Sequence, residues 1–241
     1  MPAPRQATRA RQTQPPTRTS PRSKRERILE VATAYFGEHG YEDTKWADVA
    51  AAVGIGSTAL YHYFESKLHC LYVIMAEALE SFQSDFERIT AEHDDFLDAL
   101  VLVLRSGFEL SDQDVLRNRV LVAEQGLVGI SRESRREEEA RQLARARTRD
   151  IEFAWATFLV RGMEQGLVPR ADPRLLTRAL LGLYNSVWHW YRPRGTLRLE
   201  ELADFFVRRQ LAVLGVDADP VDRQPGSDAQ PVRRHSRQAR R

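Results

Sequence analysis

Four ring-bearing side chains stand next to one another in the stretch GIGSTALYHYFESK, residues 54–67. Successive residues of a helix point about 100° apart, so four such neighbours cannot all face one core. Leu60 and Phe64 are four residues apart and can share an inward face. Tyr61 and His62 are then left outward, where a phenol and an imidazole offer hydrogen bonds to phosphate groups or base edges.

The residues before these rings complete a helix, a short turn and a second helix. In WADVAAAVGIGSTALYHYF, residues 46–64, Gly54 supplies the turn and Ser57 or Thr58 is placed to start the short second helix. This arrangement is the helix-turn-helix, whose second helix enters the DNA major groove. Ser57 and Thr58 then share the outward face with the two rings, whereas Tyr63 leans inward.

Helices alone are expected to position this segment. From Ser23 onward almost every segment has apolar residues with a 3.6-residue period, and runs of strand-type alternation are absent, so the predicted fold is all-α. The first helix is predicted to end at Gly40. Thr44 or Asp43 can cap the second helix, and Ser66 the fourth. Longer helices are expected near 95–110, 113–129, 133–165, 172–192 and 199–214.

Small N-terminal helices followed by long C-terminal ones predict two domains, at 23–70 and 71–214. The segments 1–22 and 215–241 lack an apolar period and are predicted to be disordered. Residues 1–22 form a basic arm, with Arg5, Arg9, Arg11, Arg18 and Arg22. A nonspecific contact with nucleic acid and a merely solvated tail are both open interpretations of this arm.

Composition excludes several classes of function. The 241 residues contain one cysteine, Cys70, so neither an internal disulfide nor a cysteine-based metal cage is expected. No apolar run approaches a membrane span, and the N-terminus lacks the apolar centre of a secretory signal, which favours a cytoplasmic protein without a membrane partner. The six histidines have no convincing metal spacing, and GxSxG, P-loop and Rossmann patterns are missing. We therefore expect no enzyme activity, metal or cofactor.

The run from about Arg25 to Leu71 resembles the DNA-binding domain of TetR-family transcriptional regulators. The matching features coincide in register: Phe36 before Gly40, Thr44, Asp48-Val49-Ala50, Gly54, residues 60–64 and Lys67. The resemblance implies binding of a double-stranded DNA operator through Thr44, Lys45, Ser57, Thr58, Tyr61, His62 and Lys67. In that family Tyr61 and Lys67 would mainly meet phosphates, while positions 45, 57, 58 and 62 are nearest the bases. Gly56 stands where the family commonly has serine, which leaves the cap of the third helix open between Ser57 and Gly56.

The helix expected near 172–192 has an apolar arc too wide for one core, because a surface helix needs only a stripe of about 100°. Its ridge consists of Leu176, Ala179, Leu180, Leu183, Tyr184, Val187, Trp188 and Tyr191, and Trp190 widens it. The last helix is expected to turn Leu202, Phe205 and Phe206 inward. This helix pair resembles the TetR-family dimerisation pair, and the resemblance implies a homodimer.

A polar stripe lies opposite this ridge, formed by Arg178, Gly182, Asn185, His189 and Arg192. Solvent exposure or a structural hydrogen bond is the ordinary interpretation of each of these residues. The block YNSVWHWYRPRG, however, resembles a TetR subgroup that includes acyl-CoA-responsive regulators of lipid and steroid catabolism. An effector pocket would draw on Phe108, Leu121, Trp155, Phe158, Tyr184, Asn185, Trp188 and Arg192, most of which could instead fill the core.

These patterns predict a repressor that binds a palindromic operator as a homodimer and is released by a small hydrophobic effector, with an acyl-CoA thioester as one candidate. Two alternatives stay open at this point. One is a TetR-type regulator of efflux that responds to a drug-like ligand. The other is a DNA-binding protein without a ligand.

Overall fold

The computed structural model describes residues 21–216, and for Pro21 and Arg22 only the backbone. This range contains helices and no strand, which confirms the all-α prediction. The elements are α1 (Pro21–His39), α2 (Trp46–Val53), α3 (Ser57–Tyr63), α4 (Lys67–Glu92), α5 (Phe96–Ser106), α6 (Asp112–Glu124), the 3₁₀ helix η1 (Gln125–Gly129), α7 (Arg135–Glu164), α8 (Pro173–Trp190) and α9 (Leu199–Val213).

The two predicted tails lie almost wholly outside the described residues. The part that is described departs slightly from their expected limits. α1 already begins at Pro21, where proline is tolerated because the first turn of a helix needs no amide hydrogen there. At the other end Val216 is buried against the core. The division of the helices into domains at residue 70 stays a prediction.

Local signals set most of the helix ends. Gly54 ends α2 in the left-handed conformation, with φ of 75°, and its amide bonds to the carbonyls of Ala50 and Ala51. The hydroxyl of Ser66 accepts from the amide of His69 and caps α4, as predicted. The N-cap of α3 is Gly56, which settles the alternative between Gly56 and Ser57.

The predicted cap of α2 is wrong. Lys45, and neither Asp43 nor Thr44, is the N-cap residue, and no side chain caps this helix. The Thr44 hydroxyl instead donates to the carbonyl of Gly40 at 2.7 Å. This bond closes the turn after α1, and it leaves the threonine facing away from the first turn of α2.

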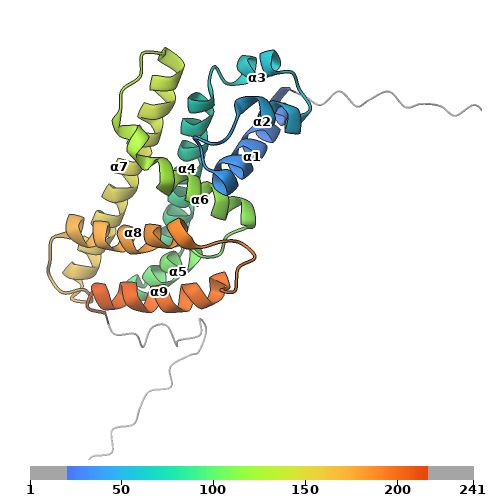
Figure 1. Cartoon of the computed structure of the whole chain (residues 1–241). Helices are drawn as coiled ribbons and strands as arrows, with labels where there is room; N and C mark the ends of the chain where they lie inside the picture. The colour runs from blue at the N-terminus through green and yellow to red at the C-terminus, as the bar shows by residue number, and fades with distance from the viewer. Residues whose placement is uncertain (1–20, 217–241) are drawn as a thin grey trace, which may run out of the picture.

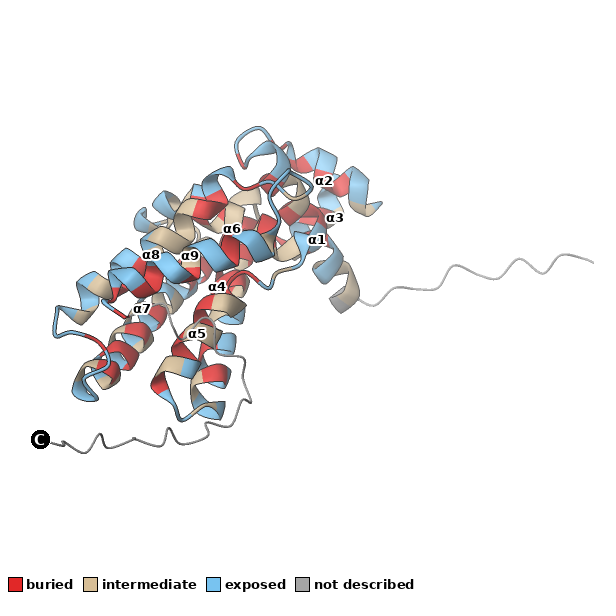
Figure 2. Cartoon of the chain, turned by 90° about the horizontal axis from the view of Figure 1, so that it is seen from below, coloured by how far each residue is buried: buried red, intermediate tan, exposed pale blue. Residues whose placement is uncertain are grey.

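The helices form one connected body around α4 (Figure 1). The α1–α3 group sits at one end, and α8 and α9 lie across the other end. α4 runs from the first group into the larger one, and its most extensive contact is with α7, which lies alongside it. Along each helix buried and exposed positions alternate at helical spacing (Figure 2). One apolar cluster accordingly extends from Leu60 and Phe64 through α4 to Leu211 of α9.

Of the three residues that the last helix is predicted to turn inward, two do so. Leu202 is buried and Phe206 is half-buried, as expected, but Phe205 is exposed. Phe206 packs against the small core cluster that contains Phe108, whereas Phe205 lies outside that cluster. Within the described residues no helix is both long and apolar enough to cross a bilayer.

Close approach of α5 and α7 depends on Gly162. A Cβ at this position would lie 2.3 Å from Cζ of Phe96, whose ring stacks on Phe158 with centroids 4.7 Å apart. We predict that Gly162→Ala lowers the free energy of unfolding by about 1–3 kcal/mol, because the added methyl group forces this aromatic pair apart. Chemical denaturation measures the change. Gly126→Ala is the control, because no atom lies within 4 Å of the Cβ it would gain; equal stabilities for the two variants would contradict the predicted clash.

Candidate nucleic-acid interface and ligand cavity

The short helix α3 divides its residues between core and solvent as the sequence predicts. Leu60 and Phe64 are fully buried, and Tyr63 is half-buried against the same cluster. Tyr61 is 51% exposed and His62 is exposed as well. Two of the four neighbouring rings therefore face the core, and two face solvent beside polar groups able to bind DNA.

Three further residues that are predicted to contact DNA are also exposed. Ser57 and Thr58 are exposed in the first turn of α3, and Lys45 is exposed at the start of α2. These hydroxyl and ammonium groups can bond to phosphates or base edges. Their contact with DNA stays a prediction.

Thr44 and Lys67 do not present their functional groups to solvent in the expected way. Thr44 is 4% exposed, and its hydroxyl already donates to the carbonyl of Gly40, so the side chain is not at the surface here. Its contact with DNA stays a prediction. The Lys67 ammonium donates to the carbonyls of Tyr41 at 2.7 Å and Thr44 at 3.1 Å, with a longer bond of 3.3 Å to Glu42. It also lies 4.2 Å from the centroid of the Tyr41 ring. An ammonium has three donors, so Lys67 is fully used in holding the α1–α2 loop against α4.

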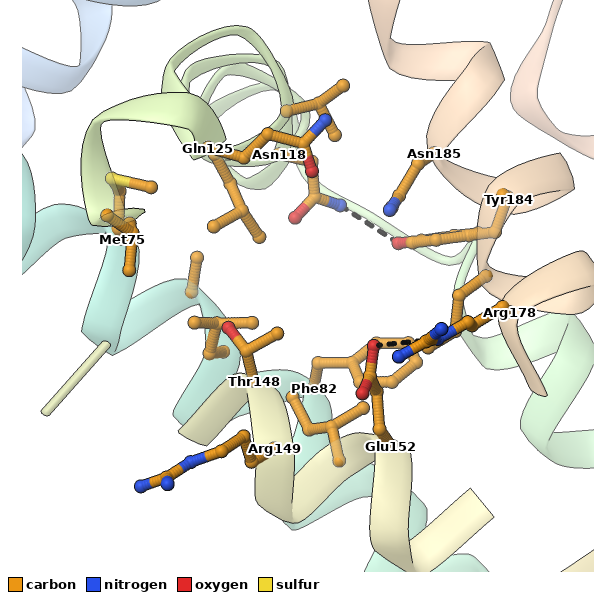
Figure 3. A pocket seen from close by; sticks show the side chains of 18 of the residues that line it. Met75, Phe82, Asn118, Gln125, Thr148, Arg149, Glu152, Arg178, Tyr184 and Asn185 are labelled. Atoms are coloured by element: carbon orange, nitrogen blue, oxygen red, sulfur yellow. Dashed lines mark hydrogen bonds and ion pairs between the residues drawn. The ribbon is translucent and has the colours of Figure 1, made fainter. Parts of the chain in front are cut away.

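A cavity of about 560 Å³ lies between α4, α6, α7 and α8 (Figure 3). This volume is typical of pockets for small molecules. Its apolar wall includes Met75, Leu79, Phe82, Leu121 and Ile151. Polar groups from three helices surround it: Asn118 from α6, Thr148 and Arg149 from α7, and Asn185 from α8.

Two polar contacts inside the cavity fix the orientation of its walls. The amide of Asn118 donates to the hydroxyl of Tyr184 at 3.0 Å. Burial raises the pKa of Tyr184, so its phenol stays protonated and keeps a hydrogen to donate. Below Tyr184 in Figure 3, Nε of Arg178 on α8 and Oε1 of Glu152 on α7 are 4.0 Å apart, and the two side chains face each other.

A second, outer cleft of about 540 Å³ adjoins this cavity between α7 and α8. Both hollows share the side chains of Arg149, Glu152 and Arg178, so these three residues form the boundary. Arg174 and the exposed ring of Phe153 line only the outer cleft. The outer cleft therefore has three arginines, Arg149, Arg174 and Arg178, and two carboxylates, Asp150 and Glu152, beside a mainly apolar cavity. The excess of cations suits a ligand with an apolar part and an anionic part.

The predicted pocket residues separate into two groups. Leu121, Tyr184 and Asn185 line the cavity, but the remaining five predicted residues do not. Phe108 and Trp188 pack into a small core cluster with α9, and Trp155 and Phe158 pack against Phe86 of α4. Arg192 is exposed, and its guanidinium donates to the carbonyls of His189 and Tyr191.

The orientation of α8 explains this outcome. Its apolar ridge packs on the core, so the polar stripe opposite the ridge is turned toward the cavity: Arg178, Gly182, Asn185 and His189 all line it. Sequence reasoning favoured the ridge and missed Arg145, Thr148 and Arg149 of α7. Their spacing of three and four residues is a helical-face signal, but a solvated face gives the same signal.

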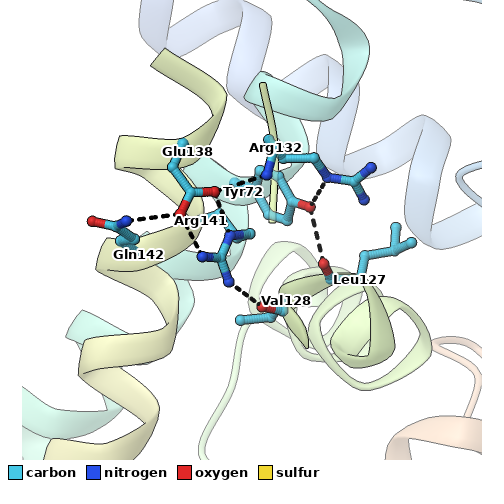
Figure 4. A network of polar contacts seen from close by, with 7 residues as sticks. All are labelled: Tyr72, Leu127, Val128, Arg132, Glu138, Arg141 and Gln142. Atoms are coloured by element: carbon cyan, nitrogen blue, oxygen red, sulfur yellow. Dashed lines mark hydrogen bonds and ion pairs between the residues drawn. The ribbon is translucent and has the colours of Figure 1, made fainter. Parts of the chain in front are cut away.

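A polar network connects the cavity wall with α4 and α7 (Figure 4). The Tyr72 hydroxyl donates to the carbonyl of Leu127 at 3.0 Å and accepts from Nε of Arg132 at 2.9 Å. Buried Arg141 donates to the carbonyl of Val128, a cavity residue, at 2.7 Å and pairs with Glu138. Hydrogen bonds from Arg141 above all lower the pKa of Glu138 to about 2, so this pair stays charged.

A second bridge joins α1 to the C-terminal helices. Arg119 of α6 donates through Nε to the carbonyl of Gly37 at 3.1 Å and through Nη1 to the carbonyl of Tyr191 at 2.7 Å. The helices approach closely here, since a Cβ on Gly37 would lie 2.8 Å from Leu116. One side chain thus contacts α1 and the end of α8 together.

Comparison with known proteins identifies two family regions. Residues 28–71 match the model of bacterial regulatory proteins of the tetR family, and residues 113–214 match that of the tetracyclin repressor-like C-terminal domain. The HTH-type transcriptional repressor KstR2 of Mycolicibacterium smegmatis is 26% identical over 199 residues, which is 80% of this chain and 91% of the relative.

Solved structures show the same likeness. The TetR family regulator PfmR from Thermus thermophilus is 32% identical with a TM-score of 0.66, over 79% of this chain and 98% of that one. AibR, solved in complex with isovaleryl coenzyme A and operator DNA, shares the fold at 23% identity and a TM-score of 0.64, over 77% and 97% of the two chains.

These relatives are transcriptional regulators, which confirms the prediction that this chain is not an enzyme. The family matches cover the helix-turn-helix around α3 and, of the helices around the cavity, α6, α7 and α8. The chain belongs to the TetR family of transcriptional regulators.

Proposed function

We propose that this chain is a homodimeric repressor that binds a near-palindromic operator through α3 and is released by an amphipathic effector in the cavity. One observation carries this proposal: α3 presents Tyr61 and His62 to solvent, and the same body of helices encloses a 560 Å³ cavity. The relative KstR2 is a transcriptional repressor, which supports repression over activation as the proposed role. A protein that reads chromosomal DNA in a bacterium acts in the cytoplasm, which is where we place it.

The homodimer is supported by apolar side chains on the outer faces of α8 and α9. Leu175 is 64%, Trp190 46% and Phe205 53% exposed. On α8 the exposed positions Leu175, Ala179 and Trp190 share one face, so a small residue lies between two large apolar ones. A second copy of the same helix pair would bury these groups. Two α3 helices could then meet major-groove half-sites about 34–36 Å apart.

The proposed effector class is an acyl thioester of coenzyme A. Its acyl chain would occupy the apolar cavity, where Asn185 and Tyr184 offer hydrogen bonds near the mouth. Its phosphates would meet Arg149, Arg174 and Arg178 at the outer cleft, which replace Arg192 as the expected cations. The isovaleryl coenzyme A bound by AibR supports this class. A drug-like effector would use the cavity without needing the arginines.

Operator recognition is tested by two substitutions on α3. We predict that Tyr61→Ala weakens binding about 10- to 100-fold on every duplex, because it removes a hydrogen bond to a charged phosphate. His62→Ala should also alter the preferred sequence if the imidazole reaches base edges. Fluorescence anisotropy on operator variants measures both effects. Phe153→Ala, at an exposed ring on α7, is the control; unchanged affinity in both α3 variants would refute the assignment of α3.

The dimer is tested by light scattering at micromolar concentration. We expect a mass of twice the 27.7 kDa of one chain. Leu175→Glu combined with Phe205→Glu should give monomers, because charges on these exposed positions disturb the contact between copies without entering the core. Leu143→Glu, at an exposed position of α7, should remain dimeric. A wild-type monomer would contradict the proposal.

The effector class is tested by comparing an acyl-CoA with its free fatty acid. We predict that the thioester binds and releases operator DNA, and that Arg174→Ala raises its dissociation constant about tenfold through loss of one charge-assisted bond. Binding of the free acid should not change, since Arg174 lies outside the cavity. Calorimetry gives both constants, and Arg170→Ala is the control. If neither compound binds, the lipid effector is wrong; if both bind equally in all variants, a drug-like effector fits better.

A further inference from the structure

The first turn of α7 contains a capping motif that is not used within its own helix. Ser134 and Glu137 have the spacing of a capping box, in which the serine hydroxyl would accept from the amide of the glutamate. Ser134 is the N-cap residue, yet its side chain makes no such bond. Its hydroxyl donates to the carboxylate of Glu65 instead. The cap of α7 therefore comes from elsewhere in the chain.

Glu65 supplies that cap. Its Oε1 accepts from the backbone amide of Glu137 at 3.1 Å, in addition to the Ser134 hydroxyl. This amide is one of those that a helix leaves unpaired at its N-terminus, where a negative charge is also favoured by the helix dipole. A residue 72 positions earlier in the sequence thus does what a local side chain usually does.

The contact is reciprocal. The carboxylate of Glu137 accepts from the hydroxyl of Ser66, and the same hydroxyl caps α4 by accepting from the amide of His69 at 2.9 Å. The Glu65 amide faces Nδ1 of His69 at 3.4 Å, and burial lowers the pKa of His69, so this imidazole stays neutral and can accept. We call the four residues Glu65, Ser66, Ser134 and Glu137 the capping clamp.

The capping clamp lies directly after the C-terminal end of α3, the helix proposed to bind DNA. Tyr63 is the last residue of α3, Ser66 is the N-cap of α4, and Glu65 lies between them. At its other side the clamp begins α7, whose 30 residues extend about 45 Å. Farther along, α7 lines the cavity with Arg145, Thr148 and Glu152. One continuous helix therefore has a cavity wall in its middle and a tie to α3 at its start.

We propose that Glu65 is a positioning residue for operator binding. Because Glu65 lies just after α3 and caps α7, it makes the C-terminal end of α3 move together with α7. This inference rests on the proposed role of α3 in DNA binding. It adds a second connection to the one through Arg119 and α6. Because coupling between two sites is reciprocal, DNA bound at α3 must then alter the stability of the first turns of α7.

Hydrogen exchange of backbone amides tests this positioning role without an effector. The full-length protein is measured alone and with a duplex that the wild type selects from genomic fragments. We expect the duplex to change exchange at least threefold both in α3 and in residues 135–141 of α7. In Glu65→Ala, α3 should still respond, whereas the change in α7 should disappear. Glu65→Gln, which keeps the shape and one acceptor, should give an intermediate response in α7.

The control variant is Glu133→Gln, which removes a charge from an exposed residue next to Ser134. It should behave as the wild type. A purely stabilising role for Glu65 would accelerate exchange in α7 but leave its response to DNA intact, and that result would overturn the proposal. An α7 segment that ignores DNA in the wild type would also overturn it, with operator binding by α3 unaffected. Absence of any response in α3 would instead refute the DNA-binding role of α3, and the inference with it.

Discussion

The packing of α4 along α7 is the interaction on which the rest of the structure depends. It begins at the capping clamp, where the first turns of both helices share hydrogen bonds. It continues through Arg147 of α7, which binds the carbonyl of Ala76 and pairs with Glu80 at 2.9 Å. It ends in the aromatic contact of Phe86 with Trp155, whose ring centroids are 5.1 Å apart. Since α4 carries α3 at one end and lines the cavity farther along, this contact fixes the distance between the two sites.

The cavity depends on how polar and apolar residues are distributed around the helices that line it. α8 has apolar residues on a wide arc, and its remaining polar stripe has to lie either in solvent or in an internal hollow. The structure turns four of the stripe residues toward the hollow between α4 and α7. The arginines of α7 complete the mouth, so charged groups lie where an amphipathic ligand would leave the apolar interior. Tyr72 and Arg141 then donate to the carbonyls of Leu127 and Val128 in the segment that closes the cavity, and Arg132 donates to the hydroxyl of Tyr72.

Periodicity and capping signals were sufficient to predict the helices and the two faces of α3. Leu60 and Phe64 are four residues apart and buried, and Tyr61 and His62 are exposed. A seven-residue helix packed on a core has little freedom to rotate about its axis, so its apolar spacing decides which residues are buried. Contacts that periodicity does not encode decided the other positions. Lys67 binds carbonyls more than 20 residues upstream, and Thr44 closes a turn, although both residue types are ordinary phosphate ligands. Similarly, Trp155 and Trp188 fill cores, since the rotation of each helix depends on its neighbours and not on its own pattern.

The most direct test of the link between core and DNA-binding surface is the distance between the two α2–α3 units of the proposed dimer. A spin label at Ala47→Cys, an exposed position of α2, reports this distance, and the native Cys70 is buried and will not be labelled. Operator DNA is predicted to select one narrow distance, consistent with α3 helices about 34–36 Å apart, and a cavity-bound acyl-CoA is predicted to shift or broaden it. The same distance distribution in the free, operator-bound and ligand-bound protein would contradict a core that controls the position of α3.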